Sequence, residues 1–243
     1  MAAHERTTRP RSELGAPAAH EGPAYGEWSA TCDTLHAHTQ VLGKLAARLA
    51  PPEPELQHAA LRLTARGWET APLPAPDGSG VVVVVLDLRT HEAVIEHNDG
   101  QSRRVPLTSN RPVGDVTREV LAAVGALAGP VEINPAPQEV WWEVPLDEDA
   151  EHSTYDPDAV AAYFAAATRA ALLLGAFRAP YRGRSSPVNA WWGSFDLAVS
   201  MFSGRLVDPP SDDFIMRNAG DAQQIEVGWW PGDPRYEKAA LFG

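Results

Sequence analysis

The sequence predicts an α+β protein in which helices pack on an antiparallel sheet. Two long stretches, residues 28–49 and 155–177, have the apolar content and end signals of helices. Between and after them lie short runs rich in β-branched and aromatic residues, separated by turns that contain Gly, Asn or Pro. Short strands joined by tight turns are typical of antiparallel pairing. Each half of the chain therefore reads as a helix followed by about three strands, in two similar halves.

The first helix is expected over residues 28–49. Leucines and His38 recur at intervals of three and four residues, and the pattern ends at Pro51 and Pro52. A second stripe on the same helix carries polar and small residues on successive turns. Its members are Cys32, His36, Gln40 and Gly43.

An antiparallel meander should follow this helix. Residues 81–85 are all valine, which predicts a central strand covered on both faces. Gly129 and Pro130 end a predicted helix, and a short edge strand is expected after them. The predicted strands are residues 60–65, 81–88, 93–97, 103–107 and 131–134, and the predicted helix is residues 113–127.

The second half opens with a helix at residues 155–177. Asp156 is a good N-cap and Pro157 suits the first helical position. The helix is apolar nearly all round, so we expect it between two layers. One long strand is predicted over residues 189–202 and a last one over residues 224–230.

The domain prediction is one compact α+β unit over residues 25–243. Residues 1–24 are rich in Ala, Pro, Glu and Arg and show no hydrophobic periodicity, which predicts a flexible tail. An internal pseudo-repeat, residues 28–134 and 152–232, is a hypothesis based on the order of elements alone.

The charge balance narrows the classes of partner. The chain has 32 acidic and 20 basic residues, and its net charge of -12 disfavours nucleic acid and anionic membranes as partners. One cysteine, Cys32, excludes an intrachain disulfide and a cysteine-based metal cluster. No signal peptide is recognisable, so we expect a cytoplasmic protein. A small-molecule ligand is the favoured partner. The sequence indicates neither a cofactor nor an oligomeric state.

The strand predicted at residues 189–202 carries the most informative polar face. Strand alternation places Trp192, Ser194 and Asp196 on one side, together with Ser200. A carboxylate among aromatic side chains is costly to bury without partners, which indicates a pocket or a polar network. The alternative is that Asp196 only accepts hydrogen bonds from a loop.

Tryptophan is unusually frequent. The chain has eight, and six form the adjacent pairs 141–142, 191–192 and 229–230. Indoles provide broad apolar contact and one hydrogen-bond donor, as ligand pockets require. The alternative is that they fill the core.

His36 and His152 are the best-placed acid–base candidates, with Asp196 as their carboxylate partner. The same three residues could instead form a two-histidine, one-carboxylate metal site, although they lack diagnostic spacing. No metal ligand is assigned. Side chains expected to contact the substrate are Trp28, Gln40, Tyr155, Trp192, Ser194, Arg205 and Trp230.

Several motifs resemble an uncharacterised bacterial domain-of-unknown-function family, number five-nine-nine-six. They include Thr34-Leu35-His36, Tyr155-Asp156-Pro157 and Trp230-Pro231-Gly232, and the most specific block runs from Trp192 to Arg205. The chain departs from the family pattern at Asn189, where a histidine is common. The resemblance supports the order of the motifs and implies no activity, cofactor or partner.

Three functional hypotheses follow. The preferred one is an enzyme that acts on a small molecule, with His36, His152 and Asp196 in acid–base roles. The second is a binding or interaction module that uses the same aromatic pocket without catalysis. The third is a metal-dependent form of the first.

Overall fold

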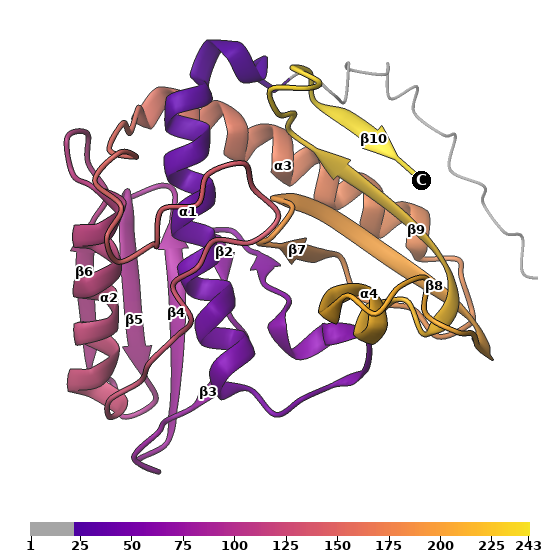
Figure 1. Ribbon diagram of the computed structural model, residues 1–243, viewed down its shortest axis with the longest axis horizontal. Helices are drawn as coiled ribbons and strands as arrows, with labels where there is room; N and C mark the ends of the chain where they lie inside the picture. The colour runs from indigo at the N-terminus through magenta and orange to yellow at the C-terminus, as the bar shows by residue number, and fades with distance from the viewer. Residues whose placement is uncertain (1–21) are drawn as a thin grey trace, which may run out of the picture.

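The computed structural model describes residues 22–243 and confirms the α+β class with antiparallel sheets (Figure 1). The tail predicted over residues 1–24 falls mostly outside this range. The helices are α1 (Tyr25–Leu49), the short 3-10 helix η1 (Pro54–Ala59), α2 (Val113–Ala128), α3 (Pro157–Arg178) and α4 (Phe214–Ala219). As predicted, Asp156 caps α3 by accepting hydrogen bonds from the backbone N–H groups of residues 158 and 159.

The strands form two antiparallel sheets, at the left and right of Figure 1. The first sheet has the order β1-β2-β4-β5-β6, with β3 also paired to β4, and the second has the order β10-β9-β8-β7. The strands of the first sheet are β1 (Arg62–Leu63), β2 (Gly67–Glu69), β3 (Leu73–Pro74), β4 (Val81–Asp87), β5 (Glu92–His97) and β6 (Ser102–Pro106). Those of the second are β7 (Asn189–Trp191), β8 (Asp196–Leu206), β9 (Ala222–Trp230) and β10 (Ala240–Phe242).

The two sheets are joined edge to edge. Leu61, just before β1, and Ala190 in β7 form an isolated antiparallel bridge, with N–H to carbonyl distances of 3.0 and 2.9 Å in the two directions. Leu61 is fully buried at this junction. The bridge continues the ladder from β1 to β7, so the halves of the chain share one hydrogen-bonded layer.

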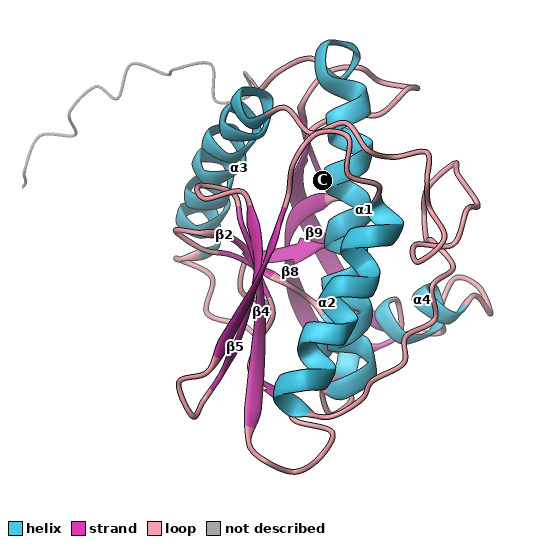
Figure 2. Ribbon diagram, turned by 90° about the vertical axis from the view of Figure 1, so that its left-hand side faces the viewer, coloured by secondary structure: helices cyan, strands magenta, loops and turns pink. Residues whose placement is uncertain are grey.

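Helices cover both sides of this layer (Figure 2). α1 and α2 pack together on the first sheet, whereas α3 lies on the opposite side against β8 and β9. α3 is long and apolar enough to cross a membrane by length and composition, a test that core helices also pass. It buries one face on the sheet and leaves Leu172, Leu173 and Phe177 exposed. The expectation that it lies between two layers is therefore wrong.

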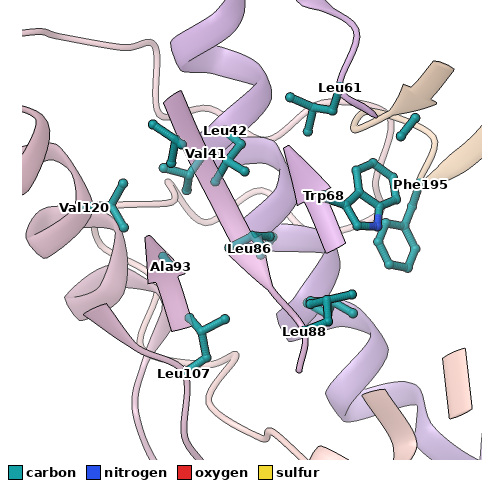
Figure 3. Close-up of a cluster of buried hydrophobic side chains, with 14 of the residues drawn as sticks. Val41, Leu42, Leu61, Trp68, Leu86, Leu88, Ala93, Leu107, Val120 and Phe195 are labelled. Carbon is teal, nitrogen blue, oxygen red and sulfur yellow. The ribbon is translucent and has the colours of Figure 1, made fainter. Parts of the chain in front are cut away.

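The core runs continuously from the first sheet to the second. Trp68 in β2 is fully buried and stacks on Phe195, with ring centroids 5.3 Å apart (Figure 3). Tyr163 of α3 also stacks on Phe195, with ring centroids 5.1 Å apart, and its hydroxyl accepts a hydrogen bond from the Trp68 indole N–H at 3.1 Å. These three aromatic rings connect both sheets to α3.

Three details of the sequence prediction need correction. Residues 189–202 do not form one strand, because a turn at residues 192–195 separates β7 from β8. Residues 131–134 form no strand. The two halves do not each contain three strands. Among the described residues, the sheet of the first half has six strands and the sheet of the second half has four. The pseudo-repeat therefore stays a prediction without support from the strand count.

Matched leucine substitutions test the importance of the sheet junction. Leu61→Ala should lower the free energy of unfolding by about 2–5 kcal/mol, because it empties a fully buried site. Leu172→Ala on α3 should change it by less than about 0.5 kcal/mol, because that side chain is 71% exposed. Urea denaturation measures both. Equal effects would contradict the assignment of Leu61 to the junction.

Candidate functional site

A cleft of about 830 Å³ opens between the two halves of the chain. Its walls come from α1, the loop around Gln138, the turn between β7 and β8, α4, β9 and the segment after Trp230. The lining is mixed: it includes four tryptophans, His36 and five carboxylates. Its size and its combination of aromatic and polar groups suit a small-molecule site.

Trp192 is fixed in the cleft wall by close contact with α1. A Cβ atom at Gly43 would overlap the Trp192 indole ring, so only glycine leaves room for it. The indole N–H donates to the carbonyl oxygen of Ala59 at 3.0 Å. The small residue in the polar stripe of the first helix thus determines where this indole packs.

His36 holds the turn that follows Trp192. Its Nε2 lies 2.9 Å from the carbonyl oxygen of Trp192 and 3.0 Å from that of Gly193. Two acceptors at this nitrogen require it to carry the proton. Burial lowers the pKa of His36 to about 4, so the imidazole is neutral at pH 7.

Phe195 completes the turn with an unusual backbone conformation. Its φ is 57°, a left-handed value that non-glycine residues seldom adopt. The ring stacks on His36 at 4.8 Å and on Trp68 and Tyr163 in the core, and this packing offsets the backbone strain. Trp191 and Asp196 then become cross-strand partners on one face. Alternation along one continuous strand over residues 189–202 would put Trp191 on the face opposite to Asp196, and this part of the prediction is wrong because of the turn.

Asp196 is a buried carboxylate at the cleft wall. The residue is 5% exposed, and Ser194, on the turn, donates a hydrogen bond to its Oδ1. Burial is the main cause that raises its pKa to about 7, the Ser194 hydrogen bond opposes the rise, and the charges of Glu226 and Glu139 add to it. No ion pair to Asp196 occurs within residues 22–243.

Four further carboxylates line the cleft, and three of them form no ion pair within residues 22–243. Asp33 on α1 accepts hydrogen bonds from the Tyr25 hydroxyl, and burial raises its pKa to about 6. Glu226 on β9 accepts a hydrogen bond from Ser200 at 2.8 Å. Glu139 lies against the turn, since its carboxylate occupies the space that a side chain at Gly193 would need. The cleft is therefore acidic as well as aromatic.

Gln40 positions Glu139 without lining the cleft itself. Its side-chain amide donates to the carbonyl oxygen of Gln138 at 2.9 Å, and its Oε1 accepts from the Gln138 N–H at 2.9 Å. This paired contact anchors the loop to α1. Glu139 follows immediately, with a φ of 57°.

Five of the ten predicted site residues line the cleft, and five do not. His36, Trp192, Ser194, Asp196 and Trp230 are in its wall. Trp28 stacks on Tyr163 in the core, Tyr155 contacts His91 through its hydroxyl, and Arg205 is exposed at the far part of β8. Gln40 has the anchoring role just described. The expectation of direct substrate contact is not supported by the positions of Trp28, Tyr155 and Arg205.

His152 lies apart from the cleft. Its Nδ1 is 2.7 Å from the carboxylate of the buried Asp149, which raises the pKa of the imidazole. The Trp142 indole contacts both predicted catalytic histidines, with its centroid 5.5 Å from His36 and 4.7 Å from His152, and no hydrogen bond joins the two histidines within residues 22–243. His36, His152 and Asp196 thus do not converge. In the described part of the chain, no three His, Cys, Asp or Glu residues are grouped to hold a metal ion.

Sequence reasoning missed most of the acidic lining. Asp33 follows Cys32 directly, next to the polar stripe of α1, and this is the one local signal that could have revealed it. Glu226 reaches the site because it pairs with Ser200 across β8 and β9. Glu139 lies in an irregular loop. Neither the strand register nor the loop path can be read from the residues alone.

Two glycine substitutions test the packing of Trp192. Gly43→Ala should destabilise the protein by about 1–3 kcal/mol and shift tryptophan fluorescence, because the indole must move. Gly175→Ala on α3 should be neutral or stabilising by up to about 1 kcal/mol, since no atom lies near the new methyl group. Thermal unfolding with fluorescence detection measures both effects. A Gly43→Ala variant with unchanged stability and fluorescence would contradict the close packing of Trp192 against Gly43.

The contributions of two buried aspartates, Asp196 and Asp149, to folding stability should change with pH in opposite directions. The pKa of Asp196 is raised in the folded state, so its contribution to stability falls as pH rises from about 4 to about 7. Asp196→Asn should therefore stabilise the protein by about 2 kcal/mol or more at pH 8.5 and change it little at pH 5.

Asp149 is the matched control. Burial acts to raise its pKa, but the hydrogen bonds from His152 and Glu151 and the charge of His152 together outweigh burial and lower the pKa. The stabilising contribution of Asp149 is therefore present above pH 4 and lost as pH falls. Asp149→Asn should destabilise the protein by about 1–3 kcal/mol at both pH 6 and pH 8.5. Urea unfolding at these pH values measures both variants. A destabilising Asp196→Asn at pH 8.5 would contradict the electrostatic account of the cleft.

Comparison with known proteins gives a family and no activity. Residues 23–243 match the model of a family of unknown function, DUF5996. No curated protein and no solved structure matches the chain. Because the match covers nearly the whole chain, the resemblance carried by the sequence motifs is confirmed, and the protein belongs to the DUF5996 family of unknown function.

Proposed function

We propose that the protein is an enzyme that acts on a small molecule bound in the cleft, with Asp196 as the group that transfers a proton. The observation that carries the proposal is the position of this carboxylate. It is buried at the cleft wall, and within residues 22–243 it has no cationic partner and one side-chain hydrogen-bond partner, Ser194. An uncompensated buried charge destabilises a fold, which is typical of residues retained for function.

The ionisation of Asp196 supports this role. A general acid or base works best when its pKa is near the working pH, and the pKa of Asp196 is about 7. His36 is a positioning residue in this proposal, because its protonated nitrogen is occupied by two backbone carbonyl oxygens. It keeps the turn, and with it Ser194 and Asp196, fixed relative to α1.

A non-catalytic binding module is the second candidate. One observation favours it: within residues 22–243, Asp196 forms no hydrogen bond with a second titratable side chain that could exchange a proton with it. The same indoles and carboxylates would then bind a ligand without breaking a bond.

Untargeted mass spectrometry of a cell extract incubated with the protein tests the proposal. We expect at least one metabolite to be depleted and one product to appear in proportion to protein. Asp196→Asn should reduce this turnover at least 100-fold, the order of loss expected for an acid–base group. Asp208→Asn, at an exposed loop position, is the matched control and should retain full activity.

The pH profile separates the two candidates. If Asp196 transfers a proton, turnover by the unmodified protein should show an ionisation near pH 7. A metabolite that co-purifies or binds but is recovered unchanged would establish the binding module instead. Turnover that survives Asp196→Asn would show that another group does the chemistry.

A further inference from the structure

We propose that the molecule bound in the cleft is a small organic cation with an apolar body, such as an amine or guanidinium compound. This inference rests on the proposed function of the same cleft and adds the chemical class of the ligand. It stands on three features: the charges that line the cleft, the indoles between them and the buried carboxylate at its wall.

The charge lining the cleft is strongly one-sided. Asp33, Glu139, Asp196 and Glu226 all line it, and none forms an ion pair within the part of the chain that the structure describes. Carboxylates gathered in a cleft with low-dielectric walls attract cations and repel anions. The net charge of -12 on the whole chain acts in the same direction.

The basic side chains in the cleft do not neutralise these carboxylates. Arg235 is paired with Asp233, 2.8 Å away, and its side chain is 90% exposed. His36 has its Nε2 proton shared between two carbonyl oxygens and is neutral at pH 7. The Nδ1 atom of His58 accepts a hydrogen bond from the backbone N–H of Glu53, and His58 forms no ion pair within residues 22–243. A bound cation would supply the missing positive charge.

The burial of Asp196 sets it apart from the other carboxylates of the cleft. Unlike the exposed Glu139 and Glu226, it is more than nine-tenths buried, and it lines the cleft with only the Ser194 hydroxyl as a side-chain partner. The other buried aspartates of the described residues, Asp87, Asp149 and Asp233, each accept hydrogen bonds from a basic side chain. Within residues 22–243, the carboxylate of Asp196 therefore lacks the basic hydrogen-bond donor that each of the other buried aspartates has.

The indoles define the rest of the ligand. Trp191, Trp192 and Trp230 are half-buried in the cleft wall, and Trp141 is 51% exposed at its edge. The Lys44 ammonium already lies 5.4 Å from the ring centroid of Trp192, so the other three indoles are the ones that a ligand cation would contact. Indole faces attract cations and cover apolar groups at the same time. The described carboxylates are not grouped as a metal site. A diffuse organic charge attached to a hydrocarbon body fits this arrangement better than a point-like metal ion.

Binding measurements with matched probes test the inference. We would titrate the full-length protein at pH 8 with phenethylamine, 2-phenylethanol and phenylacetate, which differ mainly in charge, and follow binding by calorimetry and tryptophan fluorescence. Putrescine, 1,4-butanediol and succinate form a second matched series without the aromatic ring. We expect the amine in at least one series to bind at least 10-fold more tightly than its neutral and anionic counterparts.

Substitutions locate the binding. Glu226→Gln and Asp196→Asn should each weaken amine binding at least 5-fold and leave binding of the neutral probe unchanged. Glu132→Gln, an exposed loop position outside the cleft, should change neither. Asp196, which faces Ser194, Glu226 and Glu139, becomes protonated at low pH, so amine binding should also weaken between pH 8 and pH 5.5.

The outcomes separate this inference from the proposed function. Preferential binding of the alcohols or acids in the cleft, abolished by Trp192→Ala, would overturn the cationic ligand and leave the small-molecule site in place. Amine binding that is insensitive to both carboxylate substitutions would also overturn it, as would no amine binding at millimolar concentration. Amine binding without any turnover in cell extracts would support the cationic ligand and count against the enzyme.

Discussion

The contact between the β7–β8 turn and α1 is the interaction on which the candidate site depends. The turn carries Trp192, Ser194 and Phe195, and it is attached to the helix in two ways. The Trp192 indole packs where Gly43 has no side chain, and His36 donates its ring proton to two carbonyl oxygens of the turn. Asp196 begins β8 directly after this turn, so its place in the cleft wall follows from the same contact.

Acidic and aromatic residues have two roles in this protein: some stabilise the fold, and others line the cleft. Trp68, Tyr163 and Phe195 form a stacked core that joins both sheets to α3. The tryptophans at the cleft leave part of their rings uncovered. The acidic residues differ in the same way. The carboxylate of Asp149 has a basic partner, His152, whereas that of Asp196 has none within residues 22–243. Stability and ligand binding therefore use the same residue types in different electrostatic surroundings.

Local patterns were sufficient to predict the main elements. The period of the leucines located α1, the capping residues Asp156 and Pro157 located the start of α3, and the valine run located β4. The polar stripe with His36 and Gly43 was also visible, and it does face the candidate site. Half of the predicted site residues line the cleft, because His36 and the segment from Trp192 to Asp196 are brought together by the turn.

The other features of the fold and of the candidate site could not be predicted from local patterns, because they depend on contacts between segments that are distant in the sequence. Residues 189–202 have the composition of one strand, and the turn within them is stabilised by packing of Phe195 against three rings from other elements. The register that brings Glu226 beside Ser200 also leaves no local signal. The central claim, that the cleft holds an uncompensated buried carboxylate, is tested most directly by a carbon-13 NMR titration of the Asp196 carboxyl, assigned by its loss in Asp196→Asn. We expect an apparent pKa near 7. A pKa near 4, the ordinary value of an exposed aspartate, would contradict it.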